Sequence, residues 1–544
     1  MRCLALLAGL LLLSPARARG DEGVAFHGSL QLRATSERNV PGTAVRYDPA
    51  ADAFDLGSYL HTEGTDDYGS TLAALAFEGR HLDGDLHWVL ALDSGEIRRQ
   101  RFYPNTSVCW SPKTDSGLSV PGSGQCGLYK LSRLRWARII VPVEETTPGS
   151  LQWTSNGRAV RDEATHTWFV REAYVAYSMG PARFLTLSAG RWRTSVADGY
   201  VYDDYATGVE VRADLGAIGP QWDLSAAAFQ PTRDLPGSVQ GITPMVVVRA
   251  DYLPSLYAHV GLFAAGLRQG SGGLGNALQT AVEERLVGEA EGSAGDPAQL
   301  PLHRAADQLL AATLASDYSS DATLGWLGTS GRLDLSPSQR LGFTAALLGG
   351  EIHSASTGTG VEVAEDVQLR GQLASLRYDA ELGRGFSAGF YFLYLSGDEL
   401  PQATLGTTGV IDPATGTYRG FVTVAPYITE TNLFFGGGLS ESFADRQSTT
   451  PGVNGRGVIA PVASLGFDPT EGVSVRAKGA RLWADAKGPL GGRVYGTETD
   501  LELSWQAAGW LVLGAELDAL FPGDFFRGHD TLTKALLALD VLTP

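Results

Sequence analysis

The stretch that decides the fold is Thr497 to Gln506, which reads TETDLELSWQ. One set of its side chains alternates strictly with a charged and polar set: Thr497, Thr499, Leu501, Leu503 and Trp505 against Glu498, Asp500, Glu502, Ser504 and Gln506. A period of two predicts a β-strand with one apolar and one polar face. The same alternation recurs at 29–34, 85–93, 209–215 and 473–479. Soluble sandwiches share this pattern, so alternation alone does not place the strands in lipid.

The lengths of the connections separate the two possibilities. Short turns at 83–84, 180–181, 216–220, 253–255, 336–338, 468–472 and 507–509 alternate with long connections at 38–68, 96–164, 194–206, 231–241, 269–319, 351–365, 397–454, 484–494 and 522–530. Such an alternation is typical of a transmembrane antiparallel β-barrel with tight periplasmic turns and long outer loops. Taking 397–454 as one outer or pore loop predicts about 18 strands (16 to 18) in an all-β chain.

Two segments inside these loops need separate interpretation. Asn432 to Gly438 reads as a strand, but a strand there would break the even count, so we expect a loop segment folded into the pore. Leu302 to Ser316 has helical spacing and helix-forming residues, which predicts one short helix within the 269–319 loop.

Composition agrees with a large all-β protein. Glycine supplies 68 of the 544 residues, and charged residues make up 19%, below the usual ~25%. The net charge of −18 argues against a nucleic-acid partner, which needs a basic surface. After the first few positions, no apolar run reaches the ~18 residues of a membrane helix.

The N-terminus predicts export. A basic start, an apolar run from Leu4 to Leu13 and small residues around Arg17 indicate a signal peptide over residues 1–20. The remaining 21–544 are expected to form a single barrel in the bacterial outer membrane. Export also favours a disulfide between Cys109 and Cys126. No zinc-like Cys/His spacing and no catalytic trio stand out, so we expect no metal, no cofactor and no enzyme activity.

The charge is unevenly spread. Between residues 96 and 141 there are eight basic residues and only two acidic ones, Glu96 and Asp115, and aromatic residues are interleaved with them. Folded into the pore, this segment could select anionic, sugar-like solutes. Alternatively, it is an outer loop that binds lipopolysaccharide phosphates, and the sequence leaves both open. The eight basic residues are Arg98, Arg99, Arg101, Lys113, Lys130, Arg133, Arg135 and Arg138.

Alternation also assigns faces to the strand residues. The side chains expected to line the lumen are Arg33, Glu210, Arg212, Asp214, Arg370, Arg476, Lys478, Glu498, Asp500 and Glu502. Both charge signs on this wall predict a hydrated channel. The side chains expected to face lipid include Val246, Val248, Leu511, Leu513, Leu537, Leu539 and Val541, with Trp222, Tyr252, Trp510 and Phe521 in the aromatic girdles.

Three stretches resemble the outer-membrane porins typified by alginate-export proteins. They are EAYVAYS and LSAGRWRTSVADGYVYDDYATGVEV within 172–211, TNLFFGGG at 431–438, and YGTETD at 495–500 with FPGDFF at 521–526. The resemblance covers about a fifth of the chain. It implies an 18-stranded barrel with a basic lumen, and it points to Arg191, Arg193, Asp203 and Asp204 near the pore loop. The chain ends in Leu539–Pro544 without the terminal aromatic residue usual in such barrels.

These observations predict a channel that exports an extracellular or capsular polysaccharide, or a related anionic solute. The alternative is a general or nutrient-uptake porin of the same fold. The expected partners are outer-membrane lipid, lipopolysaccharide, the solute and a periplasmic export protein. The residues expected to set selectivity are Arg98, Arg99, Arg101, Arg133, Arg135, Arg138, Arg191, Arg193, Arg212, Arg370, Arg476 and Lys478.

Overall fold

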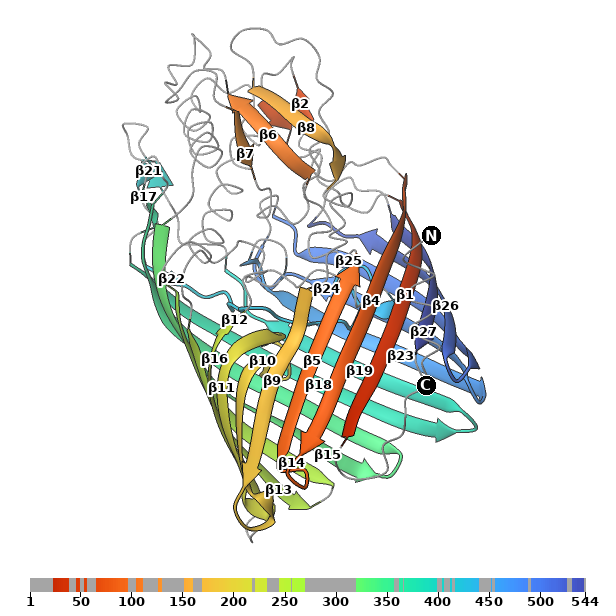
Figure 1. The fold of residues 1–544 in the computed structure, drawn as a ribbon. Coiled ribbons are helices and arrows are strands. Elements are labelled where there is room, and N and C mark those ends of the chain that lie inside the picture. Colours follow the sequence, from red (N-terminus) through yellow and green to blue (C-terminus); the bar gives the residue numbers. More distant parts are fainter. Residues whose placement is uncertain are drawn as a thin grey trace.

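The chain forms a closed, antiparallel β-barrel of 18 strands, as the sequence predicts (Figure 1). The computed structural model describes residues 23–38, 46–48, 53–55, 65–95, 104–110, 126–129, 151–159, 169–217, 221–231, 244–255, 257–269, 319–356, 362–364, 366–398, 404–405, 411–412, 416–439, 452, 455–487, 491–525 and 531–542. No helix among them is long and apolar enough to cross a membrane.

Each barrel strand pairs with its sequence neighbours in the wall. The barrel strands are β1 (Gly23–Arg38), β4 (Thr65–His81), β5 (Leu86–Gly95), β9 (Phe169–Met179), β10 (Leu185–Val196), β11 (Tyr202–Asp214), β12 (Trp222–Pro231), β13 (Met245–Ser255), β14 (Ala258–Gln269), β15 (Ser319–Ser336), β16 (Gln339–Ser356), β18 (Val367–Gly383), β19 (Phe386–Leu395), β23 (Val458–Thr470), β24 (Val473–Trp483), β25 (Val494–Ala508), β26 (Leu511–Pro522) and β27 (Leu532–Leu542). Antiparallel pairing of β1 with β27, with Arg33 opposite Ala538, closes the barrel.

The remaining strands are short. The strands β17 (Glu362–Ala364) and β22 (Thr417–Tyr418) extend the barrel sheet, and β22 runs parallel to β18. The others form small separate sheets: β2 (Arg46–Asp48) with β3 (Ala53–Asp55), β20 (Thr404–Leu405) with β21 (Ile411–Asp412), and β6 (Pro104–Trp110) between β7 (Cys126–Tyr129) and β8 (Leu151–Ala159).

The outer face of the barrel is apolar. Val246 and Val248 on β13 and Leu537 on β27 are each more than half exposed, as the alternation predicts. Near the strand ends, Trp222 packs on its cross-strand neighbour Tyr252 with 4.9 Å between ring centroids. An apolar band bordered by aromatic residues on an even-stranded barrel is the exterior of a bacterial outer-membrane protein. The chain therefore spans that membrane through its strands.

Several sequence predictions fall outside the described residues. They are the signal peptide over 1–20, the helix over 302–316, and Arg98, Arg99, Arg101, Arg133, Arg135 and Arg138. The backbone register of β6 and β7 sets Cys109 opposite Cys126, and the disulfide itself stays a prediction.

Candidate functional site: a lumen divided by two inserted segments

The first inserted segment is the tip of the β10–β11 hairpin, residues 192–205. Pairing of β10 with β9 ends at Arg191, and pairing of β11 with β12 ends at Ala206. Beyond these positions the two strands pair with each other and leave the wall. Gly190 and Gly208 lie opposite each other just before this point, and the backbone of a neighbouring strand occupies the place where a Cβ atom would stand on each of them. Glycine at both positions permits this close approach.

The hairpin tip reaches the opposite wall. The hydroxyl of Thr344, on the inner face of β16, donates to the Asp198 carboxylate at the turn of the hairpin. The hydroxyl oxygens of Tyr200 and Tyr391 on β19 lie 2.9 Å apart. Burial raises the pKa of Tyr200 to about 12, so this phenol stays neutral and can share a hydrogen bond with Tyr391. The DGYVYDDY stretch is therefore an element that crosses the lumen.

The second inserted segment comprises residues 416–439, between β19 and β23, and is called the strap here. It joins the hairpin tip through four backbone hydrogen bonds. The N–H groups of Val424 and Ala425 donate to the Val201 carbonyl at 2.8 and 3.2 Å. The Tyr427 N–H donates to Gly199 at 2.9 Å, and the Asp203 N–H donates to Ala425 at 2.8 Å. The two segments thus form one continuous partition inside the barrel.

A group of carboxylates on the inner wall holds the far end of the strap. Glu498 on β25 uses both oxygens, accepting from the N–H groups of Leu433 at 2.5 Å and Phe434 at 3.0 Å. Glu516 on β26 accepts from the Leu439 N–H at 2.5 Å, and Arg33 on β1 donates to the Leu439 carbonyl at 2.6 Å. Hydrogen bonds from backbone amides to charged groups are among the stronger ones in proteins.

Asn432 lies at the centre of these contacts. Its amide nitrogen donates to Glu502 at 3.1 Å and to Asp518 at 2.9 Å, and its amide oxygen accepts from Lys478 at 3.1 Å. The wall beneath it carries a cross-strand row of charges in register, with Asp500 next to Lys478 on one side and Asp518 on the other, and Lys534 beyond Asp518. The amide nitrogen of Asn432 thus meets carboxylates of this wall, and its amide oxygen meets the lysine.

The partition packs against part of the inner wall through a buried apolar core. Trp326 on β15 is 2% exposed and donates its indole N–H to the Val422 carbonyl at 2.9 Å. Tyr202 packs on Phe229 of β12, and Phe434 packs on Tyr495 of β25. The core continues through the inner faces of β13 to β27. The expectation of a purely hydrated lumen is therefore wrong for this part of the wall, because the strap and the hairpin tip cover it.

The two arginines singled out by the family resemblance lie on the hairpin, on the face opposite to this core. Arg193 pairs with Asp203 at 2.7 Å, and its guanidinium lies 5.5 Å from the centre of the Tyr427 ring. Arg191 lies over the Tyr205 ring and donates to the Arg171 carbonyl at 3.0 Å. The structure thus brings Arg191 and Arg193 together at the partition.

The other predicted selectivity residues are spread over the wall. Arg212 on β11 pairs with Asp223 on the inner face of β12. Lys478 donates a hydrogen bond to Asn432 and forms an ion pair with Glu502 at 2.7 Å. The assignment of Arg370 to the lumen is wrong. On β18 the apolar side chains Val367, Leu369 and Leu373 belong to the lumen core, so Arg370 faces outward and is exposed.

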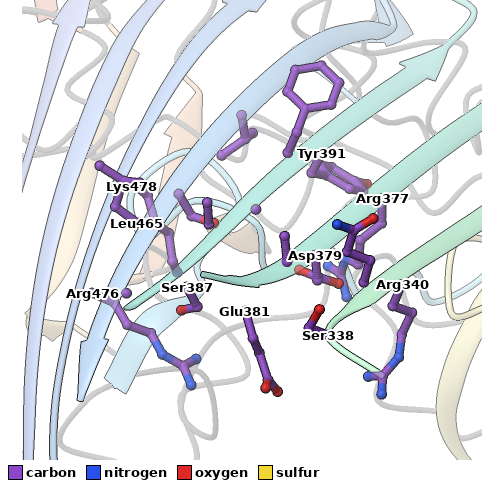
Figure 2. Close-up of a pocket in the computed structure, with 18 of the residues that line it drawn as sticks. Ser338, Arg340, Arg377, Asp379, Glu381, Ser387, Tyr391, Leu465, Arg476 and Lys478 are labelled. Atoms are coloured by element: carbon purple, nitrogen blue, oxygen red, sulfur yellow. The ribbon is translucent and has the colours of Figure 1, made fainter. Parts of the chain in front are cut away.

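Arg476 lines a water-accessible cavity on the side of the strap that faces the short turn at 336–338. This vestibule has a volume of about 730 Å³, with strap residues Thr429, Glu430, Gly438 and Leu439 in its lining. Figure 2 shows Arg476 and Arg340 on opposite sides of it. Arg476 has no ion-pair partner within the described parts of the chain. Its guanidinium is thus available to solutes.

The arginine is the more exposed partner in several lumen ion pairs. Arg193 is 48% exposed and Asp203 14%, and Arg377 is 51% exposed beside Glu430 at 20%. Arg212 is 59% exposed against 16% for Asp223. Burial raises the pKa of Glu430, and the Arg377 guanidinium opposes that shift. In these three pairs the carboxylate is largely shielded from water and the guanidinium group is exposed to it.

Comparisons with known proteins give structural neighbours only. No family model and no curated protein match the sequence, and the resemblance to alginate-export porins finds no support. A BenF-like porin from Pseudomonas fluorescens has 9% identity and a TM-score of 0.45, covering 95% of this chain and 98% of its own. OprD from Pseudomonas aeruginosa has 12% identity and a TM-score of 0.44, covering 97% and 95%. OccAB4 from Acinetobacter baumannii has 8% identity and a TM-score of 0.42, covering 95% and 97%.

Proposed function

We propose that this protein is a passive outer-membrane channel for small hydrophilic solutes, with a preference for anions, and therefore an uptake porin rather than a polysaccharide exporter. The observation that carries the proposal is the partition. The strap and the hairpin tip are joined by backbone hydrogen bonds and anchored to walls on both sides. A partition of this kind narrows the lumen, and passage of a hydrated polymer would require it to move aside.

The preference for anions follows from which charges meet the water. The chain carries −18 overall, but Glu498 and Glu516 in the lumen bind backbone amides of the strap. Asp203, Asp223 and Glu430 lie behind the more exposed guanidinium groups of arginines. Exposed guanidinium groups attract and hydrogen-bond anionic solutes. No chemical step is proposed, because selection by pore width and by the field of the lumen charges is sufficient for a channel.

Reconstitution into planar bilayers tests this function. We expect discrete channels whose reversal potential in a salt gradient indicates preference for chloride over potassium. In proteoliposome swelling assays, we expect small sugars and carboxylates to enter while oligosaccharides of increasing length are progressively excluded. Passage of long polysaccharide at a rate similar to that of monosaccharides would refute the proposal, as would the absence of any conductance.

A further inference from the structure

Three glycines lie side by side on the outward face of the barrel. Gly266 on β14 is opposite Gly325 on β15, and Gly325 is opposite Gly349 on β16. The neighbouring side chains Leu267 and Leu348 are buried in the lumen core, and successive side chains of a strand point to opposite faces. The three glycines therefore form a row without side chains on the outside of the wall, called the glycine row here.

Nothing in the barrel itself requires glycine at these positions. None of the three has a positive φ, and the register of the strands is continuous around them, so neither a turn nor a bulge accounts for them. A Cβ atom on Gly349 would meet no atom within 4 Å, and on Gly266 and Gly325 it would meet only backbone oxygens at 3.8 to 4.0 Å. Glycine weakens a strand, and without a bulge or bend it marks the close approach of a ligand or of another backbone.

The glycine row lies at the outer end of the apolar band. Toward the short turn at 336–338, Leu327 and Leu347 lie opposite each other and are 64% and 60% exposed, as expected of side chains in lipid. In the other direction β14 ends at Gln269, where the long connection to β15 begins. Long connections of such barrels are extracellular, so the glycine row lies where the hydrocarbon of the outer leaflet meets its headgroups.

Two exposed arginines stand at the ends of the glycine row. Arg370 on β18 continues the row, directly opposite Gly349, and Arg268 on β14 lies two residues beyond Gly266. Within the described part of the chain, neither arginine has an ion-pair partner. Three interstrand spacings of about 4.8 Å separate their strands, or roughly 14 Å in all. Their guanidinium groups can therefore bind two anionic groups at opposite ends of one ligand.

The outer border of the glycine row is polar and partly acidic. Thr323, Glu351 and Gln368 lie side by side in register, one row further out than the glycines. The ligand atoms of Glu351, His353 and Asp366 lie within 4.8 Å of one another. Carboxylate oxygens are typical ligands of calcium and magnesium, and such a cation can bridge a carboxylate to a phosphate. This border is therefore compatible with an anionic ligand when divalent cations are present.

We propose that the glycine row, with Arg268 and Arg370 at its ends, is a docking site for lipopolysaccharide. The membrane anchor of that lipid carries a glucosamine disaccharide with a phosphate at each end. Its sugar rings lie on the glycine row, where no side chain intervenes, and its phosphates meet the two arginines, which can bind phosphate oxygens in a bidentate manner. A second copy of the barrel is a poorer fit, because it would cover both arginines without counter-charges. The site is on the outside of the wall and does not depend on what the lumen transports.

Native mass spectrometry of the purified, delipidated barrel measures this binding. The probe is rough-type lipopolysaccharide with two phosphates, added in a magnesium-containing buffer, and its monophosphorylated form is the comparison. The test variants are the double variant Arg268→Gln, Arg370→Gln and the single variant Gly349→Leu, which fills the glycine row. The matched controls are Arg384→Gln, beyond the other end of β18, and Gly479→Leu on β24, where a Cβ atom also meets nothing within 4 Å. Heat-modifiable migration in gels verifies that each barrel is folded.

We expect one tightly bound lipid per wild-type barrel and weaker binding of the monophosphorylated form. Both test variants should raise the dissociation constant at least about tenfold, and both controls should change it less than about twofold. Absence of binding to the wild type, or unchanged binding in the folded test variants, would overturn the proposal. So would a wild-type oligomer that Gly349→Leu separates without any effect on lipid binding, since the surface would then be a contact between copies. The two test variants change different chemistry, so either one decides if the other does not assemble.

Discussion

Replacing Glu498 with alanine should detach the end of the strap from the barrel wall. Glu498 accepts hydrogen bonds from two consecutive backbone amides, those of Leu433 and Phe434, and its side chain is fully buried. In the alanine variant both amides lose a charged acceptor in a site closed to water. A hydrogen bond to a charged group contributes about 1.5–3 kcal/mol, so the two together hold the strap with roughly 3–6 kcal/mol. Since ~1.4 kcal/mol corresponds to a factor of ten, the detached population should rise about a hundredfold or more.

Hydrogen exchange measures this population directly. We expect the Leu433 and Phe434 amides to exchange at least about a hundred times faster in Glu498→Ala than in the wild type, while amides of the β25 ladder keep their protection. Single-channel recordings should show larger or more variable conductance, because the partition is held less firmly. Glu498→Gln keeps one acceptor oxygen but turns an NH₂ group toward an amide donor, so an intermediate effect is expected.

The matched control is Thr499→Ala, next to Glu498 on the outward face of β25. It should leave both exchange and conductance unchanged. If Leu433 and Phe434 in folded Glu498→Ala barrels exchange as slowly as in the wild type, Glu498 does not anchor the strap. The account of the lumen carboxylates as anchors would then be wrong.

Three further changes probe the partition and its charges. Arg193→Gln should shift the reversal potential away from anion preference and change stability by less than about 1 kcal/mol, because its ion pair with Asp203 is half exposed. Lowering the pH from about 7 toward 4.5 should strengthen the preference for anions. Because burial raises the pKa of Glu430, this carboxyl group takes up a proton early in that range and leaves Arg377 without its counter-charge. The reversal potentials of Glu430→Gln should lack this pH dependence. Gly190→Val should impair assembly or displace the hairpin tip, because no Cβ atom fits against β9 at this position. Impaired assembly would be visible as lost heat-modifiability, and a displaced tip as raised conductance. Unaltered assembly and conductance would contradict the role of Gly190 as the point of close approach.

The wall of the barrel was predictable because every strand separates two environments. The alternation in TETDLELSWQ identifies Leu501, Leu503 and Trp505 as outward residues, and all three are exposed on the barrel surface. The alternation of short and long connections then gives the strand count without any knowledge of packing. These signals are local in sequence, so a single chain is sufficient to detect them.

The partition was predictable only in part. Counting strands indicates that Asn432 to Gly438 belongs to a loop, but the residues that hold it are distant in sequence. Leu439 is bonded to Arg33, 406 positions away, and Asn432 to Asp518, 86 positions away. Alternation shows that Glu498 and Asp500 face inward, yet it gives no information on what covers them. Contacts of this kind leave no local periodicity.

The misplacement of Arg370 shows the limit of the alternation rule. The rule assigns apolar side chains to lipid and polar ones to water, which holds where the lumen is wet. In VQLRGQL, at 367–373, the apolar set faces inward instead, because Phe421 of the strap lies against Gly371 and continues the lumen core. Arg370 therefore points away from the lumen. A strand beside an inserted segment inverts the usual pattern, and such an inversion in sequence is itself a signal of an occupied lumen.

Burial reconciles the acidic composition of the chain with the exposed arginines of its lumen. Glu498 and Glu516 bind backbone amides of the strap, and Asp203 and Asp223 lie behind the guanidinium groups of arginines. Solutes respond mainly to the charges that they can approach, because the buried carboxylates are offset by the amides and guanidinium groups that they bind. Net charge is thus a poor guide to the selectivity of this barrel. The exposed arginines of the hairpin tip and the vestibule are the groups whose replacement should change it.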